Sequence, residues 1–115
     1  MEKPEDLPEM TGLEFAAIRH RMNLSPIDLA KILDVTTRAV RRWEADGADI
    51  PPGVLEQLHA LDEKHAALAR ELASTPGVAS VRRDPTLYRA LPRKWYVSAL
   101  ARAMEGNPDL RADWT

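Results

Sequence analysis

The sequence predicts a mainly helical protein: a bundle of short helices followed by a small strand-helix-strand segment. Apolar residues recur at helical spacing from about residue 12 to residue 73, with short turn signals between the runs. After Ser-Thr-Pro-Gly at 74–77, the pattern changes to short alternating runs on either side of one more helix. We therefore expect three parts, namely a flexible acidic leader at 1–10, a helical domain with a long closing helix at 11–73, and a C-terminal dimerisation segment at 74–115.

Composition limits the kinds of protein this chain can be. The 115 residues include no cysteine, which excludes disulfides and thiolate metal sites and suits a reducing cytoplasm. No apolar run approaches the roughly 18 residues of a membrane span, and residues 1–10 lack the pattern of a signal peptide. The net charge of −2 is unevenly distributed, because residues 75–104 carry six basic residues against one acid. We expect a cytoplasmic protein that carries local positive patches.

The first helix is predicted from Gly12 to Met22. Thr11 and Glu14 have the spacing of a capping box, in which each side chain satisfies a free backbone amide at the helix start. The candidates for its buried face are Leu13, Phe15, Ala16 and Ala17, followed at helical spacing by Ile18 and Met22.

Two shorter helices joined by a tight turn are predicted within residues 25–45. Ser25 is a good N-cap, Pro26 suits the first helical position, and Asp28 lies where a capping acid belongs. The apolar stripe of this helix consists of Ile27, Ala30 and Leu33, broadened by Leu29 and Ile32.

The turn and the next helix have equally clear signals. Asp34 occupies a position that requires a left-handed backbone, which Asp tolerates better than most residues, and Val35 returns to the core. Thr36 is the expected N-cap of a helix that ends before Gly47, a left-handed terminator. The apolar positions of this helix are Ala39, Val40 and Trp43, which leaves Thr37, Arg38, Arg41 and Arg42 facing outward.

From Met10 to about Leu61 the chain resembles the lambda-repressor-like helix-turn-helix family, of the Cro/C1 or XRE type. The residues that carry the resemblance are Ser25, Leu29-Ala30, Leu33, Val35, Thr36, Val40, Trp43-Glu44 and Ile50-Pro51. The chain departs from the family pattern at Pro26, where a phosphate-touching glutamine is common, and at Asp34, where glycine is common.

The resemblance implies a site on double-stranded DNA. Residues near the start of the second motif helix read bases in the major groove, and by position these are Thr37, Arg38, Arg41 and Arg42. It also implies a partly buried structural ion pair between Arg19 and Glu44. The amides that open the Ser25 helix form a candidate phosphate site, with side chains contributed by Arg21, Ser25, Thr36 and, as a further candidate, His20.

The remaining chain is predicted to be one long helix and a tail. Between Val54 and Ala73, five leucines and His65 recur at spacings of three and four, and the part after Leu61 requires a packing partner. Strands are expected at 78–81 and at Leu110–Trp114, with a helix at 93–105 between them. This layout is similar to small dimeric phage and bacterial repressors, including those associated with anti-CRISPR operons, which implies dimerisation through Trp95, Tyr96, Leu100, Leu110 and Trp114.

Enzyme chemistry is not indicated. His59 and His65 lie six residues apart and do not share a helix face, while Asp62 and Glu63 are read as solvated helix surface. No H-E-x-x-H motif, glycine-rich phosphate loop or nucleophile motif occurs. We predict no catalytic activity, cofactor, metal, membrane contact or small-molecule substrate.

The sequence therefore favours a DNA-binding transcriptional regulator, expected to be a homodimeric repressor that reads an inverted repeat. Two alternatives are an interaction adaptor on a helix-turn-helix scaffold and the antitoxin of a toxin pair. The tail residues Arg82, Arg83, Arg89, Arg93 and Lys94 either extend the DNA footprint or form the soluble face of the dimerisation segment.

Overall fold

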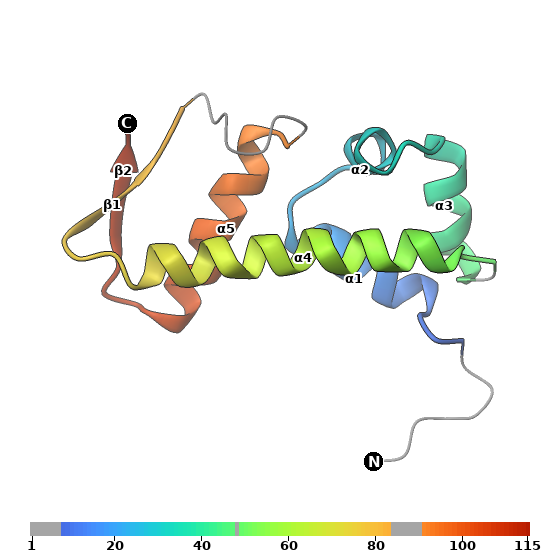
Figure 1. The fold of residues 1–115 in the computed structure, drawn as a ribbon, viewed down its shortest axis with the longest axis horizontal. Coiled ribbons are helices and arrows are strands. Elements are labelled where there is room, and N and C mark those ends of the chain that lie inside the picture. Colours follow the sequence, from blue (N-terminus) through green and yellow to red (C-terminus); the bar gives the residue numbers. More distant parts are fainter. Residues whose placement is uncertain (1–7, 48, 84–90) are drawn as a thin grey trace, which may run out of the picture. The chain divides into compact units, whose positions relative to one another are not determined.

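The computed structural model describes residues 8–47, 49–83 and 91–115, and this part of the chain is mainly helical with one small sheet (Figure 1). Most of the predicted leader, together with Arg89 in the tail, lies outside the described residues. The elements in chain order are α1 (Gly12–Arg21), α2 (Pro26–Leu33), α3 (Thr37–Asp46), α4 (Pro52–Ala73), β1 (Val78–Val81), α5 (Arg93–Gly106) and β2 (Arg111–Trp114).

The chain divides into two compact units, and the division falls inside α4. The N-terminal unit ends at Leu58 and the C-terminal unit begins at His59. The sequence had suggested a boundary at the linker 74–77. The difference arises because the second part of α4 packs with the elements that follow it, so a continuous helix contributes to both units.

Local capping signals position the first three helices as predicted. The Thr11 hydroxyl accepts from the Glu14 amide, and the Glu14 carboxylate accepts from the Thr11 amide. Ser25 and Asp28 form a second capping box, and the Thr36 hydroxyl accepts from the Ala39 amide at 3.1 Å. These caps satisfy backbone amides that have no partner within their own helices.

The core of the N-terminal unit corrects two predicted faces. In α1 the buried residues are Gly12, Phe15 and Arg19, whereas Leu13 is 80% exposed and Ala17 is also exposed. In α2, Leu29, Ala30 and Leu33 are buried, but Ile27 is 51% exposed. Both differences have one cause: helical spacing identifies the apolar residues, but the neighbouring helices determine which of them are covered.

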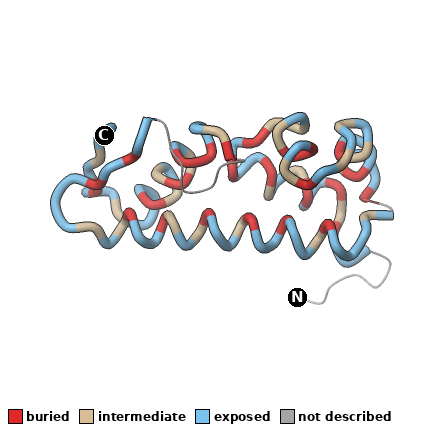
Figure 2. The backbone as a smooth tube through the Cα atoms, turned by 45° about the horizontal axis from the view of Figure 1, so that its top comes forward, coloured by how far each residue is buried: buried red, intermediate tan, exposed pale blue. Residues whose placement is uncertain are grey.

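Buried residues recur along one side of α4 (Figure 2). Val54 and Leu58 belong to the N-terminal unit, while Leu61, His65 and Leu72 belong to the C-terminal unit. No described helix combines the length and the apolarity needed to cross a bilayer.

The C-terminal unit contains a parallel strand pair connected through α5. β1 and β2 pair in the register Val78↔Arg111 to Val81↔Trp114, and α5 forms the crossover between them. Parallel strands require such a crossover, because a tight hairpin can join only antiparallel strands. The partner predicted for the second part of α4 is α5, which buries Trp95, Tyr96, Ala99 and Ala103.

Candidate nucleic-acid interface

Helix α3 is the centre of the candidate site. A residue in the left-handed backbone conformation precedes it, and another follows it. The chain enters through Asp34, which adopts the left-handed conformation at φ 55° and ψ 49°, and it leaves through Gly47 at φ 71°. Buried Val40 and Trp43 attach α3 to the core, and α3 packs against both α1 and α2. The tilted ring of Phe15 lies 6.0 Å from that of Trp43.

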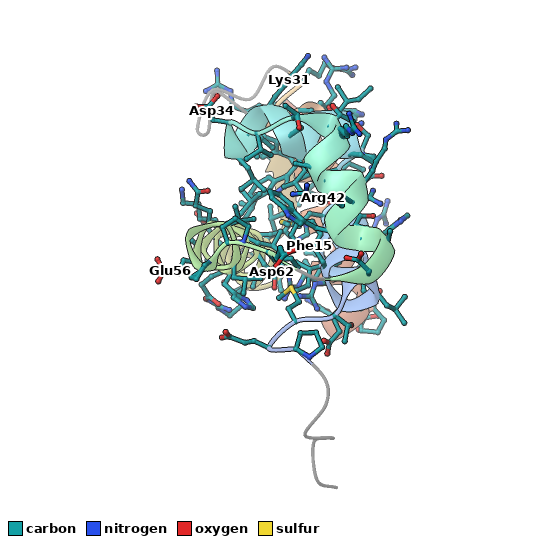
Figure 3. The ribbon with its side chains drawn as sticks, turned by 90° about the vertical axis from the view of Figure 1, so that its right-hand side faces the viewer. Phe15, Lys31, Asp34, Arg42, Glu56 and Asp62 are labelled. Atoms are coloured by element: carbon teal, nitrogen blue, oxygen red, sulfur yellow. The ribbon has the colours of Figure 1, made fainter. Side chains whose placement is uncertain are left out.

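The polar side of α3 carries the four residues predicted to read bases. Arg38, Arg41 and Arg42 are exposed, and Thr37 is half-buried at the helix start. At 3.6 residues per turn these four positions span an arc of about 140° opposite the buried residues. Figure 3 views this side of the unit, with Phe15 in the interior and Lys31 and Asp34 at the outer edge.

The three arginines, Arg38, Arg41 and Arg42, form no salt bridge with any acidic side chain that the structure describes. The first turn of α3 contains no acidic residue. A short helix with three guanidinium groups on one exposed face concentrates positive potential there, although the whole chain is slightly acidic.

The predicted ion pair between α1 and α3 is present. Arg19 donates from Nε to Glu44 Oε2 at 2.6 Å and from Nη2 to Glu44 Oε1 at 2.7 Å. Arg19 also donates from Nη1 to the Leu24 carbonyl at 2.9 Å, and this bond holds the connection between α1 and α2 against α1. The two side chains are only 9% and 15% exposed, so the pair fixes the end of α3 against α1.

A close backbone approach at Gly12 was not foreseen. A Cβ atom on Gly12 would lie 2.3 Å from the Glu44 carbonyl oxygen and 2.8 Å from that of Trp43. The start of α1 therefore touches the last turn of α3, where the helix dipoles are complementary. A glycine at the first position of a strongly capped helix is the sequence signal from which this contact could have been predicted.

The predicted phosphate contacts differ in how available they are. The Ser25 hydroxyl already donates to Asp28 Oδ2 at 2.8 Å and accepts from the Asp28 amide at 3.0 Å. The Ser25 amide donates to the same carboxylate, and Pro26 has no amide hydrogen, so the start of α2 is filled by the protein's own anion. The geometry therefore disfavours Ser25 and the α2 amides as phosphate ligands. Thr36 and Arg21 are exposed, although each also has a partner within the protein.

The basic residues of the tail lie in the C-terminal unit. Arg82, Arg83, Arg93 and Lys94 are exposed. The guanidinium carbons of Arg83 and Arg93 lie 5.5 Å and 5.9 Å from the centroid of the Trp114 ring. Arg93 also donates to the Arg83 carbonyl at 2.5 Å, so at least these two side chains help to hold β1, α5 and β2 together.

Three of the five predicted dimerisation residues are buried within the chain itself. Trp95, Tyr96 and Leu110 are at most 5% exposed and belong to the core of the C-terminal unit. A second copy could therefore contact only half-buried Leu100 and Trp114, which is 38% exposed, without rearrangement of that core.

His65 belongs to a buried polar network. His65 is fully buried, with Nε2 2.8 Å from the Ser98 hydroxyl and Nδ1 3.3 Å from Arg102 Nη1. Arg102 in turn donates to Asp62 at 3.1 Å, and so this network joins α4 to α5. Within the described residues, no cluster of three or more His, Cys, Asp or Glu side chains could hold a metal ion.

No protein-family profile matches this chain, and no curated protein matches it significantly.

Proposed function

We propose that this protein is a sequence-specific DNA-binding transcriptional regulator of the helix-turn-helix kind, and that it acts as a homodimeric repressor. The observation that carries the proposal is the exposed face of α3, with three arginines that make no ion pair among the described residues. An α-helix of this size fits the major groove, where a bidentate arginine recognises the O6 and N7 atoms of guanine.

The surroundings of α3 support the same function. The turn through Asp34 separates α2 from α3, and the Arg19–Glu44 pair fixes the end of α3. A base-reading helix must be held rigidly, because misplaced side chains lose their bidentate geometry. An adaptor would not need three exposed arginines on one face, so this feature favours DNA over a protein partner.

In the proposed mechanism, the α3 helices of two copies enter successive major grooves on one side of the duplex. Thr37, Arg38, Arg41 and Arg42 contact base edges, while Arg21 and Thr36 contact phosphates on either side. Two weak half-site contacts then act as one binding event through their high effective concentration. Covering a promoter in this way is sufficient for repression.

The proposal is tested by the salt dependence of binding to mixed-sequence duplex DNA, measured by fluorescence anisotropy. The variant Arg38→Ala/Arg42→Ala is compared with Lys64→Ala/Arg70→Ala, which removes the same charge from exposed positions of α4. We expect the α3 variant to reduce the slope of log K against log salt by up to about 2, and the α4 variant to leave it unchanged. Equal slopes for both variants, or no binding at low salt, would reject DNA as the partner.

A further inference from the structure

We propose that the outer edge of β2 is a self-pairing surface, on which strand β2 of a second copy adds antiparallel about a twofold axis at Ala112. The occupant is a second copy of this chain. The inference deepens the proposed function by naming the surface that joins the two copies, and it depends on that function only for its biological use. The resulting sheet would run β1-β2-β2-β1 across the two copies.

The free edge of β2 is identified by its hydrogen bonds. The Thr115 amide donates to the Val81 carbonyl at 3.0 Å, and the Thr115 carbonyl accepts from the Arg83 amide at 3.3 Å. Backbone groups alternate in direction along a strand, so Arg111 and Asp113 also face β1, whereas Ala112 and Trp114 face away from it. No strand within residues 8–47, 49–83 and 91–115 pairs with that outer edge.

The sequence of β2 is complementary to itself in one register. With the axis at Ala112, Arg111 stands opposite Asp113 of the second copy, and Asp113 stands opposite Arg111, which gives two ion pairs on one face of the sheet. On the other face, Ala112 stands opposite Ala112 of the second copy. An axis at Arg111 or at Asp113 would instead place like charges directly opposite each other.

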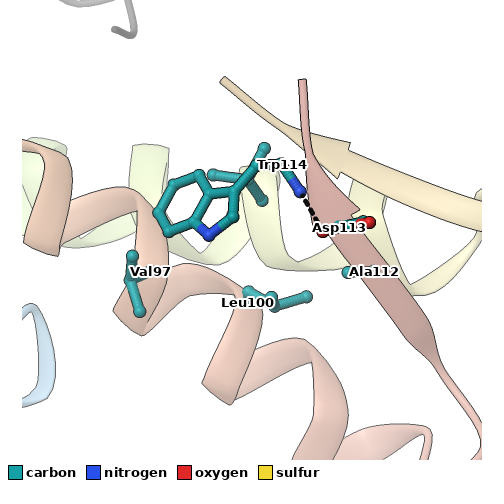
Figure 4. Close-up of a pocket in the computed structure, with 6 residues that line it drawn as sticks. Val97, Leu100, Ala112, Asp113 and Trp114 are labelled. Carbon is teal, nitrogen blue, oxygen red and sulfur yellow. Dashed lines mark hydrogen bonds between the residues drawn. The ribbon is translucent and has the colours of Figure 1, made fainter. Parts of the chain in front are cut away.

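The backbone favours the same register. Because the amide and carbonyl of Ala112 both point outward, two Ala112 residues across the axis can exchange both hydrogen bonds. The outward amide of Trp114 now donates to the Asp113 side chain at 2.8 Å (Figure 4). When Asp113 turns to Arg111 of the second copy, that amide becomes available to the carbonyl of Leu110 in the second copy.

An exposed apolar surface adjoins this edge. Val97, Leu100, Ala112 and Trp114 line a cavity of about 160 Å³ between α5 and β2 (Figure 4). Val97 is 40% exposed, and Met104, seven residues along α5, is 46% exposed. A twofold axis perpendicular to the sheet would place the two copies of α5 on the same face, where these residues can cover each other. An unpaired edge beside exposed apolar side chains is the kind of surface to which another strand adds.

Charge reversal tests the register, with the dimer dissociation constant measured by analytical ultracentrifugation in the absence of DNA. Arg111→Glu and Asp113→Lys each create two like-charge contacts, so each is expected to weaken the dimer by about tenfold. The double variant Arg111→Glu/Asp113→Lys restores opposite charges and is expected to return to within about threefold of the natural chain. Circular dichroism checks that each variant is folded.

Cross-linking tests the position of the axis, because the natural chain has no cysteine. Residues paired at a hydrogen-bonded position lie about 5.5 Å apart between Cα atoms, a distance that a disulfide spans. Under mild oxidation we expect Ala112→Cys to give a covalent dimer, and the matched change Ser80→Cys, on the outer edge of β1, to give no covalent dimer. A monomeric natural chain, unaltered dimerisation in both charge variants, or cross-linking through Ser80→Cys alone would overturn the proposal. Each of these results is independent of whether the protein binds DNA.

Discussion

At the scale of single residues, Gly12 determines how closely α1 approaches α3. Its missing side chain leaves room for the carbonyl oxygens of Glu44 and Trp43, which a Cβ atom would approach to 2.3 Å and 2.8 Å. Both obstacles are backbone atoms, so neither can rotate away. We predict that Gly12→Ala destabilises the N-terminal unit by about 1–3 kcal/mol, measured by urea unfolding.

The control for this prediction is Gly53→Ala. Gly53 lies in the first turn of α4, and a Cβ atom there would meet nothing within 4 Å. Alanine is a better helix former than glycine, so this change should be neutral or stabilising by up to about 1 kcal/mol. Equal effects of the two substitutions would contradict the close approach at Gly12.

We also predict that the N-terminal unit loses stability when the Arg19–Glu44 ion pair is broken. Glu44→Leu leaves the guanidinium of Arg19 buried with the Leu24 carbonyl but without its carboxylate. Removing one partner of a fully buried pair costs about 3–5 kcal/mol, and because this pair retains some exposure we expect about 2–4 kcal/mol. The double variant Arg19→Met/Glu44→Leu should lose less than the sum of the two single changes. Additive losses would show that the two side chains are not coupled.

At the scale of elements, the contact between α4 and α5 is organised around His65. Its two ring nitrogens lie within hydrogen-bonding distance of Ser98 and Arg102, and its ring lies edge-on to Trp95 at 5.0 Å. His65→Leu leaves these polar partners without the imidazole, and we predict a loss of about 1–3 kcal/mol in the C-terminal unit.

This loss is best measured by hydrogen exchange of the α5 amides, which reports on the C-terminal unit separately. His59→Leu is the matched control, because His59 lies on the exposed side of the same helix. Faster exchange in both variants, or in neither, would contradict a specific role for His65 in joining the helices.

The element boundaries could be predicted from the sequence because their signals are local. Thr11, Ser25 and Thr36 each bond to an amide three residues away, and the left-handed backbone of Asp34 and Gly47 follows from the residue type and its place after a helix. Neither feature depends on the rest of the fold. The strand predicted at 78–81 also depended on a local signal, and it is confirmed as β1.

The buried faces of the helices and the pairing of the strands depend on packing between elements, so local sequence signals could not predict them. Leu13 and Ile27 have the spacing of core residues but are exposed, because neighbouring helices decide which sector of a helix is covered. The parallel pairing of β1 with β2 and the division of α4 between two units depend on contacts between residues distant in sequence. For the candidate site, the exposed arginines and the capping position of Asp28 were predicted. The competition between the Asp28 carboxylate and an external anion at the start of α2 was not, because it depends on where that carboxylate lies.

At the scale of the whole molecule, a slightly acidic chain carries three exposed arginines on α3 in one unit and the proposed pairing strand β2 in the other. We expect two such chains to read an inverted repeat through α3. The most direct test is selection of bound sequences from random duplex DNA at physiological salt, with Arg38→Ala/Arg42→Ala in parallel. We expect the natural chain to enrich an inverted repeat with guanines in each half-site, the half-sites centred about one helical turn apart, and the variant to fail to enrich it. Absence of any enriched sequence, or the same repeat enriched by the variant, would contradict it.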